Sequence, residues 1–435
     1  MRRTDQGPDR RPAAPTPAEP VEPVEAAREA ACGYWHRRGM PTEPSQVAVA
    51  PGASLLLIAV LAATCGVGSP GGRGAGGPQP GQSGQSGQSG RAGRGSVLLP
   101  RPCSAWYAPQ VRLLGRVPRG VPVPAECGGV PDPFALLETV SRAREEGDEP
   151  GVLVLSVADD VTGTAVPPEL LHEVCEAATG EGLLVVSDET WRDTSHRPHD
   201  TVTVSPAEML DASGHADADS VVVLTGLGPA LLPPGLHAGL ARFPRTGRGH
   251  ALGEEVREVL AALHTELSDP VGAAVAEALA EPGQPRARRA AAARLHGAFA
   301  TALHAAVTGV GAQCRPPHLG RHLYADLEQF RPRLAVRGIT DAAGLEAELV
   351  RRVGPYAAGG HRFGDDPRAL RVRLSTDVLT RALTDATRAR PASHAAGAGR
   401  AAVPDDMNPL ELPGAAEALT AVQSALADLT DGSSH

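Results

Sequence analysis

Short apolar runs alternate with amphipathic stretches between about residues 96 and 250. The runs predicted to be strands are SVLLP, VRLLGR, GVLVLSVA, GLLVVSDE, SVVVLTG and LHAGLARF, at residues 96–100, 111–116, 151–158, 182–189, 220–226 and 236–243. Residues 134–147 and 168–182 lie between them and carry apolar side chains at the 3.6-residue spacing of a helix. Buried apolar strands joined by amphipathic helices are typical of a mostly parallel sheet, so the pattern predicts an α/β domain.

The pattern changes on both sides of this region. It becomes helical through residues 254–267, 272–281 and 287–307, and then mixed as far as about residue 379. We therefore expect a disordered tail at 1–24, a large domain at 25–285 and a smaller C-terminal α+β domain at 286–387. A Gly/Ser/Gln-rich insertion is expected at 66–96 within the large domain, and residues 388–435 form a tail with one helix predicted from Pro413 to Leu429.

Composition excludes several kinds of function. All 41 basic residues of the 435-residue chain are arginines, so no mechanism that needs a lysine amine is available. A net charge of -9 gives no general attraction to nucleic acid or anionic lipid. The apolar run Ser54–Cys65 is too short to span a bilayer and predicts a buried helix. The six cysteines lack metal-ligand spacing and suit free thiols, so we expect a cytoplasmic protein with no membrane or nucleic-acid partner.

Ligands of parallel sheets bind at the carboxyl ends of the strands, where several sequence stretches follow one another. VLLPRPCSAWY, VLVLSVADDVTGTAVP, VVSDETWRD and VVVLTGLGPALLPPGLHAGLARFP come first, and RPPHLGRHLYADL and ALRVRLST follow. In this order, from about Ala30 to Leu383, they resemble the class I/II aminotransferases, which are fold-type I enzymes dependent on pyridoxal phosphate (PLP). The resemblance implies a large domain with a mostly parallel sheet between helices, a smaller C-terminal α+β domain and a dimer. It also implies amino-group transfer between an amino acid and a 2-oxo acid.

Some functional positions of the family are kept. The resemblance implies that Asp188 pairs with the pyridinium nitrogen of PLP, although a strand-ending acid in an ordinary loop is the plainer alternative. It implies that Ala53 and Ser54 begin the helix whose backbone amides hold the phosphate, unless Ser54 is a simple helix cap. It places Arg371 on the substrate α-carboxylate. Arg373 lies two residues further along the same strand face, so the alignment with the family leaves open which of the two arginines takes this role.

Other positions of the family are lost. The Schiff-base lysine position is Pro229, which has no amine. The resemblance also places Gly226 and His237 at phosphate contacts, Ser104 at the ring-stacking aromatic, Asp160 at the asparagine that bonds the ring hydroxyl, and Trp191 at the tyrosine after the aspartate. A carboxylate at Asp160 repels a phenolate unless it is protonated.

Three hypotheses follow. The first is a catalytically degenerate pseudoenzyme, either a homodimer or a partner subunit of an active paralogue. The second is a lysine-independent enzyme that binds PLP or pyridoxamine phosphate non-covalently, with His237, or less plausibly His322 or His361, as base; a protein that binds no cofactor is the remaining outcome. The third, a transcription regulator with an aminotransferase-like effector domain, is disfavoured because the first 25 residues are too short and Pro-rich for a winged helix.

Overall fold

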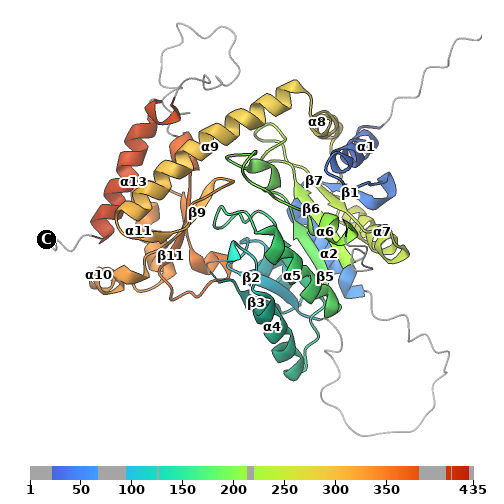
Figure 1. Cartoon of the computed structure of the whole chain (residues 1–435), viewed down its shortest axis with the longest axis horizontal. Helices are drawn as coiled ribbons and strands as arrows, with labels where there is room; N and C mark the ends of the chain where they lie inside the picture. The colour runs from blue at the N-terminus through green and yellow to red at the C-terminus, as the bar shows by residue number, and fades with distance from the viewer. Residues whose placement is uncertain are drawn as a thin grey trace, which may run out of the picture.

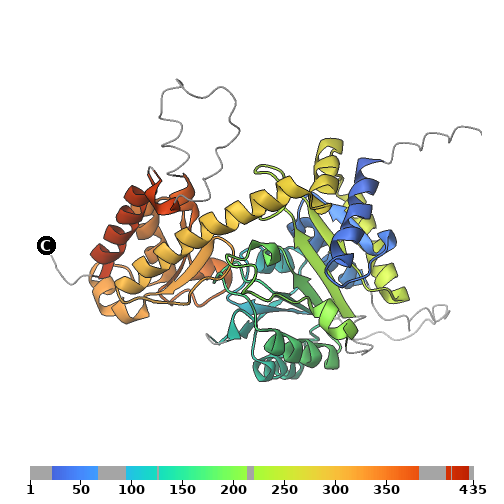
Figure 2. The same ribbon diagram turned by 45° about the horizontal axis from the view of Figure 1, so that its top comes forward.

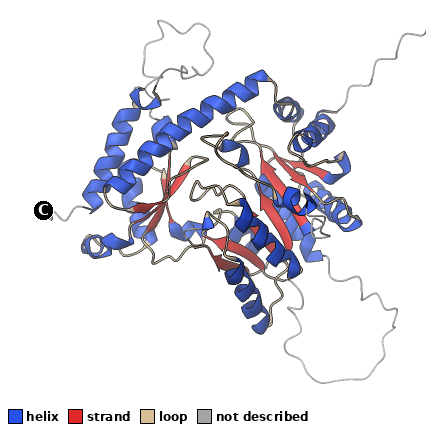
Figure 3. Ribbon diagram, viewed as in Figure 1, coloured by secondary structure: helices blue, strands red, loops and turns tan. Residues whose placement is uncertain are grey.

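The computed structural model describes residues 22–66, 95–124, 127–212, 220–381, 408–412 and 414–430. These residues form two sheets with their own helices, joined by the long helix α9 (Gly283–Gly309) (Figure 1, Figure 3). Most of the expected N-terminal tail, most of the expected Gly-rich insertion and residues 382–407 lie outside the described residues. Helix α1 begins at Pro23, so the last two residues of the expected N-terminal tail are helical instead.

The larger sheet has seven strands in the order β1-β7-β6-β5-β4-β2-β3. Neighbours from β6 to β3 pair in parallel, whereas β7 is antiparallel to both β6 and β1. The predicted α/β class with a mostly parallel sheet is therefore confirmed. The strands are β1 (Val47–Ala50), β2 (Val97–Arg101), β3 (Pro118–Pro122), β4 (Val152–Ser156), β5 (Leu184–Asp188), β6 (Val221–Gly226) and β7 (Gly239–Arg242).

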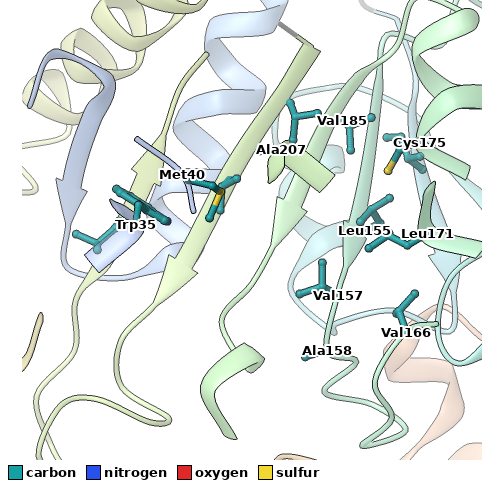
Figure 4. Packing of buried hydrophobic residues seen from close by; sticks show 14 of the residues in the cluster. Trp35, Met40, Leu155, Val157, Ala158, Val166, Leu171, Cys175, Val185 and Ala207 are labelled. Atoms are coloured by element: carbon teal, nitrogen blue, oxygen red, sulfur yellow. The ribbon is translucent and has the colours of Figure 1, made fainter. Parts of the chain in front are cut away.

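Helices cover both faces of this sheet because alternate strand residues point to opposite sides. Leu153 and Leu155 of β4 belong to one core cluster, and Val152 and Val154 belong to the other. Figure 4 shows part of the first cluster, including Leu155. The first face is covered by α1 (Pro23–His36), α4 (Pro133–Glu145), α5 (Pro168–Gly180), α6 (Pro206–Ala212) and α8 (Asp269–Leu279). The second is covered by α2 (Ala53–Gly66), α3 (Tyr107–Leu113) and α7 (Gly247–Ala262).

One predicted strand is wrong. Residues 111–116 contain the end of α3 and the turn after it, with Val111 buried and Leu113 exposed. Strand β2 already pairs with β3 on one side and β4 on the other, so β2 has no free edge to which this segment could add. The strand that continues the sheet is the proline-bounded PRGVP of β3, and proline is tolerated there because β3 is an edge strand.

The smaller sheet is antiparallel, in the order β10-β11-β9-β8. Helix α13 lies where a C-terminal helix was predicted, but its Val422, Leu426 and Leu429 belong to the core of the small domain rather than to a tail. The strands are β8 (Gln313–Cys314), β9 (His322–Asp326), β10 (Ala357–Gly359) and β11 (Arg371–Ser375), and the helices are α10 (Arg331–Val336), α11 (Ala342–Val353) and α13 (Ala415–Thr430). The 3-10 helices that lie wholly within the described residues are η1 (Pro44–Gln46), η3 (Arg192–Thr194), η5 (Glu328–Phe330), η6 (Gly360–Phe363) and η7 (Pro409–Glu411).

The two domains meet at the carboxyl edge of the large sheet. The carbonyl of Gly163 accepts hydrogen bonds from the backbone amides of His318 (2.7 Å) and Leu319 (3.1 Å), and the amide of Cys103 donates to the carbonyl of Phe363 (3.0 Å). Helix α9 runs from the large domain to the small one (Figure 2). Among the described helices, none is long and apolar enough to cross a membrane.

Candidate functional site

The carboxyl ends of β4, β5 and β6 form the centre of the candidate site. In the parallel register Ser156 lies opposite Asp188, and the Ser156 hydroxyl donates to the Asp188 carbonyl at 3.1 Å. Gly226 ends β6 opposite Gly239 of β7, and its amide donates to the Thr190 hydroxyl at 3.0 Å. Sheet pairing thus brings together loops that the sequence places 30 to 80 residues apart.

Asp188 is buried and held in one orientation. The Tyr107 hydroxyl donates to its Oδ2 at 2.7 Å, and the Thr190 amide donates to its Oδ1 at 2.9 Å. Burial raises the pKa of Asp188, while the hydrogen bonds from Thr190 and Tyr107 lower it. A carboxylate oxygen has a second lone pair, so Asp188 is still able to accept a ligand N–H.

Asp160 lies beside an arginine of the small domain. The Ser104 hydroxyl donates to its Oδ2 at 3.0 Å, and the same oxygen is 3.8 Å from Nη1 of Arg373. Burial raises the pKa of Asp160 to about 7; Asp159 and Asp188 add to this rise and Arg373 opposes it. The sequence-predicted residues Ser104, Asp160 and Asp188 are therefore neighbours in the structure.

The structure corrects the expectation for Arg371. Its Nε donates to Asp326 at 2.8 Å and its Nη1 to Asp365 at 3.0 Å, so two carboxylates of the small domain already satisfy its charge. Arg373 makes no hydrogen bond to any residue that the structure describes, and its Cζ lies 4.5 Å from the centre of the Phe363 ring. Of the two arginines between which the sequence left the choice open, Arg373 is the one whose guanidinium lies beside Asp160.

The start of α2 lies against β7. A Cβ atom at Gly239 would be 2.5 Å from the amide nitrogen of Ala53, so only glycine permits this approach. Ala53 is buried, whereas Ser54 and His237 are exposed. Free backbone amides at the start of this helix favour an anion. The cationic contact that the resemblance assigns to position 237 is replaced by an exposed histidine for which the structure gives no partner.

Trp191 and His322 close the side of the site that faces the small domain. Their rings lie edge to face with centroids 5.6 Å apart, and an added Cβ at Gly320 would be 3.4 Å from Trp191. Burial lowers the pKa of His322 well below its ordinary value, and Arg373 lowers it further. The imidazole is therefore neutral, and its buried Nδ1 has no hydrogen-bond partner. His361 instead lies 3.8 Å from Glu346 in the small domain.

Pro229 lies in the turn after β6 and lines a cavity of about 20 Å³. The other lining residues include Ala230, Arg289, His296 and Arg321, and none of them carries an amine. Burial lowers the pKa of His296 to about 3, and its Nδ1 lies 3.1 Å from the Thr376 hydroxyl. The residues that line this cavity thus offer no amine that could form a Schiff base with an aldehyde.

Two neighbours of the site were not singled out from the sequence. Tyr107 is part of the VLLPRPCSAWY stretch and begins α3, but nothing in that stretch indicates its hydrogen bond to Asp188. Thr190 supplies both an amide to Asp188 and a hydroxyl to Gly226, and its position two residues after Asp188 was the available signal.

Comparisons with known proteins agree on the fold. The model of the family "Aminotransferase class I and II" matches residues 85–385. No curated protein matches the sequence. The structure is similar to the aspartate aminotransferase of Thermus thermophilus with maleate, at a TM-score of 0.66 and 18% identity, covering 94% of this chain and 83% of that one.

Two further solved structures are similar over nearly the whole chain. An aromatic aminotransferase from Pyrococcus horikoshii has a TM-score of 0.65 at 15% identity, with 94% of this chain and 86% of that one covered. The aspartate aminotransferase of Rhizobium meliloti has a TM-score of 0.63 at 15% identity, with 93% and 82% covered. At these identities the structural likeness establishes the fold alone.

Proposed function

The chain belongs to the family of class I and II aminotransferases, and from this premise we propose that it is a catalytically degenerate member. The single observation that carries the proposal is the absence of lysine from all 435 residues. The family's amino-group transfer uses a lysine amine to hold PLP covalently and to move the α-proton. No realignment of Pro229 restores that amine, because the chain has none to offer.

The remaining residues fit a cofactor that is held without a covalent bond. Asp188 would accept the pyridinium N–H of PLP or pyridoxamine phosphate, and Tyr107 and Thr190 fix its orientation. The backbone amides that begin α2 at Ala53 would bind the phosphate. When bound, the cofactor supplies an electron-accepting ring. In its ionised form, the half-buried Asp160 would repel the phenolate and weaken such binding.

Arg373 is the residue that we assign to a ligand carboxylate. Its side chain is 23% exposed and makes no hydrogen bond within the described part of the chain, so its donors are available for two-pronged recognition. Arg371 is less suited to that role because its guanidinium already pairs with Asp326 and Asp365.

The experiment is a calorimetric and absorbance titration with PLP and, separately, with pyridoxamine phosphate. Asp188→Asn is the test variant. Asp326→Asn is the matched control, because it removes an acid that pairs with Arg371 and not with the proposed cofactor. Weak, reversible binding that is lost in Asp188→Asn supports a retained non-covalent site. A binding isotherm that Asp188→Asn leaves unchanged contradicts it.

A second candidate function is lysine-independent proton transfer. It is favoured by the neutral, half-buried His322 imidazole beside Trp191, whose buried Nδ1 has no hydrogen-bond partner among the described residues. His237 is less suited than expected because it is exposed. Deuterium exchange at the α-carbon of an amino acid, with PLP present and compared between the native chain and His322→Phe, tests this function. No His322-dependent exchange contradicts it.

We propose a dimer as the functional unit, formed by two copies or with an active paralogue. Affinity purification from the native cell, followed by mass measurement of the intact complex, distinguishes the two. A mass of one chain alone contradicts both.

A further inference from the structure

Arg373 is a mostly covered cation with one nearby acid. Its side chain is 23% exposed, its Cζ lies over the Phe363 ring, and burial lowers its pKa. Among the described residues the acid within 4.0 Å is Asp160, at 3.8 Å from Nη1. That separation is longer than a hydrogen bond, so the two charges attract each other across the domain boundary without a directed contact.

Asp160 is directed toward this place by the large domain. The Ser104 hydroxyl holds its Oδ2 at 3.0 Å, and Asp160 directly follows Asp159 in the loop after β4. The carboxylate of Asp159 instead accepts hydrogen bonds from the amides of Val161 (3.1 Å) and Thr162 (3.2 Å). Of these two neighbouring acids, Asp159 fixes its own loop and Asp160 extends to the arginine.

We propose that Asp160 acts as an internal anion at Arg373 and determines which ligands this site accepts, by competing with any external carboxylate. The inference rests on the proposed role of Arg373 as the carboxylate site. A ligand carboxylate forms two short hydrogen bonds to a guanidinium where Asp160 forms none, so it displaces Asp160 but must do so against the Coulomb attraction of the existing pair. A carboxylate-only ligand then binds weakly while Asp160 is ionised.

The competition depends on pH through the groups around Asp160. These groups are Asp159 on its own loop, Asp188 at the end of β5, Cys103 and Tyr107 before and on α3, His322 on β9 and Arg373 on β11. His322 stays neutral from pH 6 to pH 8, because its pKa lies well below the ordinary value. Protonation of Asp160, with a pKa of about 7, removes the competing charge and frees Arg373. Replacing Asp160 should therefore remove the part of the pH dependence of carboxylate binding that is due to its titration.

The test is calorimetric titration of the full chain with maleate at pH 6 and pH 8, without cofactor. Asp160→Asn keeps the side-chain shape and removes the charge, and Asp160→Ser is a second variant in case the first misfolds. Asp326→Asn removes a comparable acid from Arg371 and is the matched control. Arg373→Gln removes the anion site, and circular dichroism checks that each variant is folded.

We expect Asp160→Asn to bind maleate about tenfold more tightly than the native chain at pH 8. At pH 6 the affinity of the native chain should approach that of the variant. Asp326→Asn should behave as the native chain does, and Arg373→Gln should lose binding. Equal affinities of the native chain and Asp160→Asn at pH 8, with binding lost in Arg373→Gln, overturn the internal competition and leave the carboxylate role of Arg373 standing. Binding that Arg373→Gln does not change, or no binding by any variant, overturns both.

Discussion

Glu281 and Arg38 form an ion pair, with 3.2 Å between Oε1 and Nη2, although 243 residues separate them. The same carboxylate oxygen accepts a hydrogen bond from Arg289 at 2.8 Å. Glu281 lies between α8 and α9, so this cluster connects α1 with the start of the helix that leads to the small domain. Burial alone would raise the pKa of Glu281, but the hydrogen bonds from Arg38 and Arg289 hold it at about 2.

Glu281→Gln should therefore destabilise the fold. The native side chain is 9% exposed and is shared by three arginines, Arg37, Arg38 and Arg289, so its loss should cost about 2–4 kcal/mol at pH 7. Because the folded pKa lies below the unfolded one, the stabilisation is complete above the unfolded value and is lost as the pH falls through about 2. Urea denaturation at pH 7 and pH 3 measures the difference. Glu138→Gln, in an exposed pair with Arg142, is the control and should cost less than about 0.5 kcal/mol.

Gly239→Ala should displace the start of α2. The added Cβ would come within 2.5 Å of the Ala53 amide nitrogen and 2.6 Å of the Gly52 carbonyl carbon, and backbone atoms on both sides have no room to move. We expect a loss of about 1–3 kcal/mol, together with weaker binding of phosphate-bearing ligands. At Gly247, where nothing lies within 4 Å of an added Cβ, the same substitution should leave the melting temperature nearly unchanged. Equal effects at the two sites would contradict the packing argument.

Tyr107→Phe removes the hydroxyl that donates to Asp188. The buried carboxylate then has one protein donor fewer, so the pKa of Asp188 should rise above its already raised value. The expected loss of about 1–3 kcal/mol at pH 8 should shrink at lower pH, because a protonated Asp188 does not need the donor. Tyr356→Phe is the control, since its hydroxyl makes no hydrogen bond within the described residues. Chemical denaturation of both variants at two pH values tests the prediction.

Asp160→Asn should flatten the dependence of stability on pH. The folded pKa of about 7 lies above the ordinary value of 3.8, so between those values the folded chain holds a proton that the unfolded chain has released. The free energy of unfolding of the native chain therefore falls as the pH rises through this window. The fall between pH 5 and pH 8 should be smaller in the variant by about 1 kcal/mol or more. An unchanged slope would show that Asp160 does not titrate there.

The sequence predicted the structure best where the spacing of apolar residues and their burial indicate the same element. The run VVSDE predicts both the strand β5 and an acid at its end, because a continuous apolar run followed by Asp188 has few other readings. The helix α3 was not predictable from its own residues. Val111, Leu113 and Leu114 suit a strand as well as a helix, and what decides against a strand is that β3 and β4 already flank β2.

The candidate site shows the same limit. Spacing alone did not decide between Arg371 and Arg373, since residues two apart on a strand share a face. The structure favours Arg373 because sheet pairing and a turn bring Asp326 and Asp365 to Arg371, where they pair with its guanidinium. Tyr107 and Asp188 are likewise joined by packing over 81 residues, which no local pattern records.

The central claim, that this aminotransferase scaffold does not carry out lysine-dependent amino-group transfer, is tested most directly by an activity assay. The purified chain is incubated with PLP, a pool of amino acids and a 2-oxo acid acceptor, and formation of the new 2-oxo acid is followed against PLP alone. We expect a rate equal to that of free PLP and the same rate for Asp188→Asn. Turnover above that background that disappears in Asp188→Asn would contradict it.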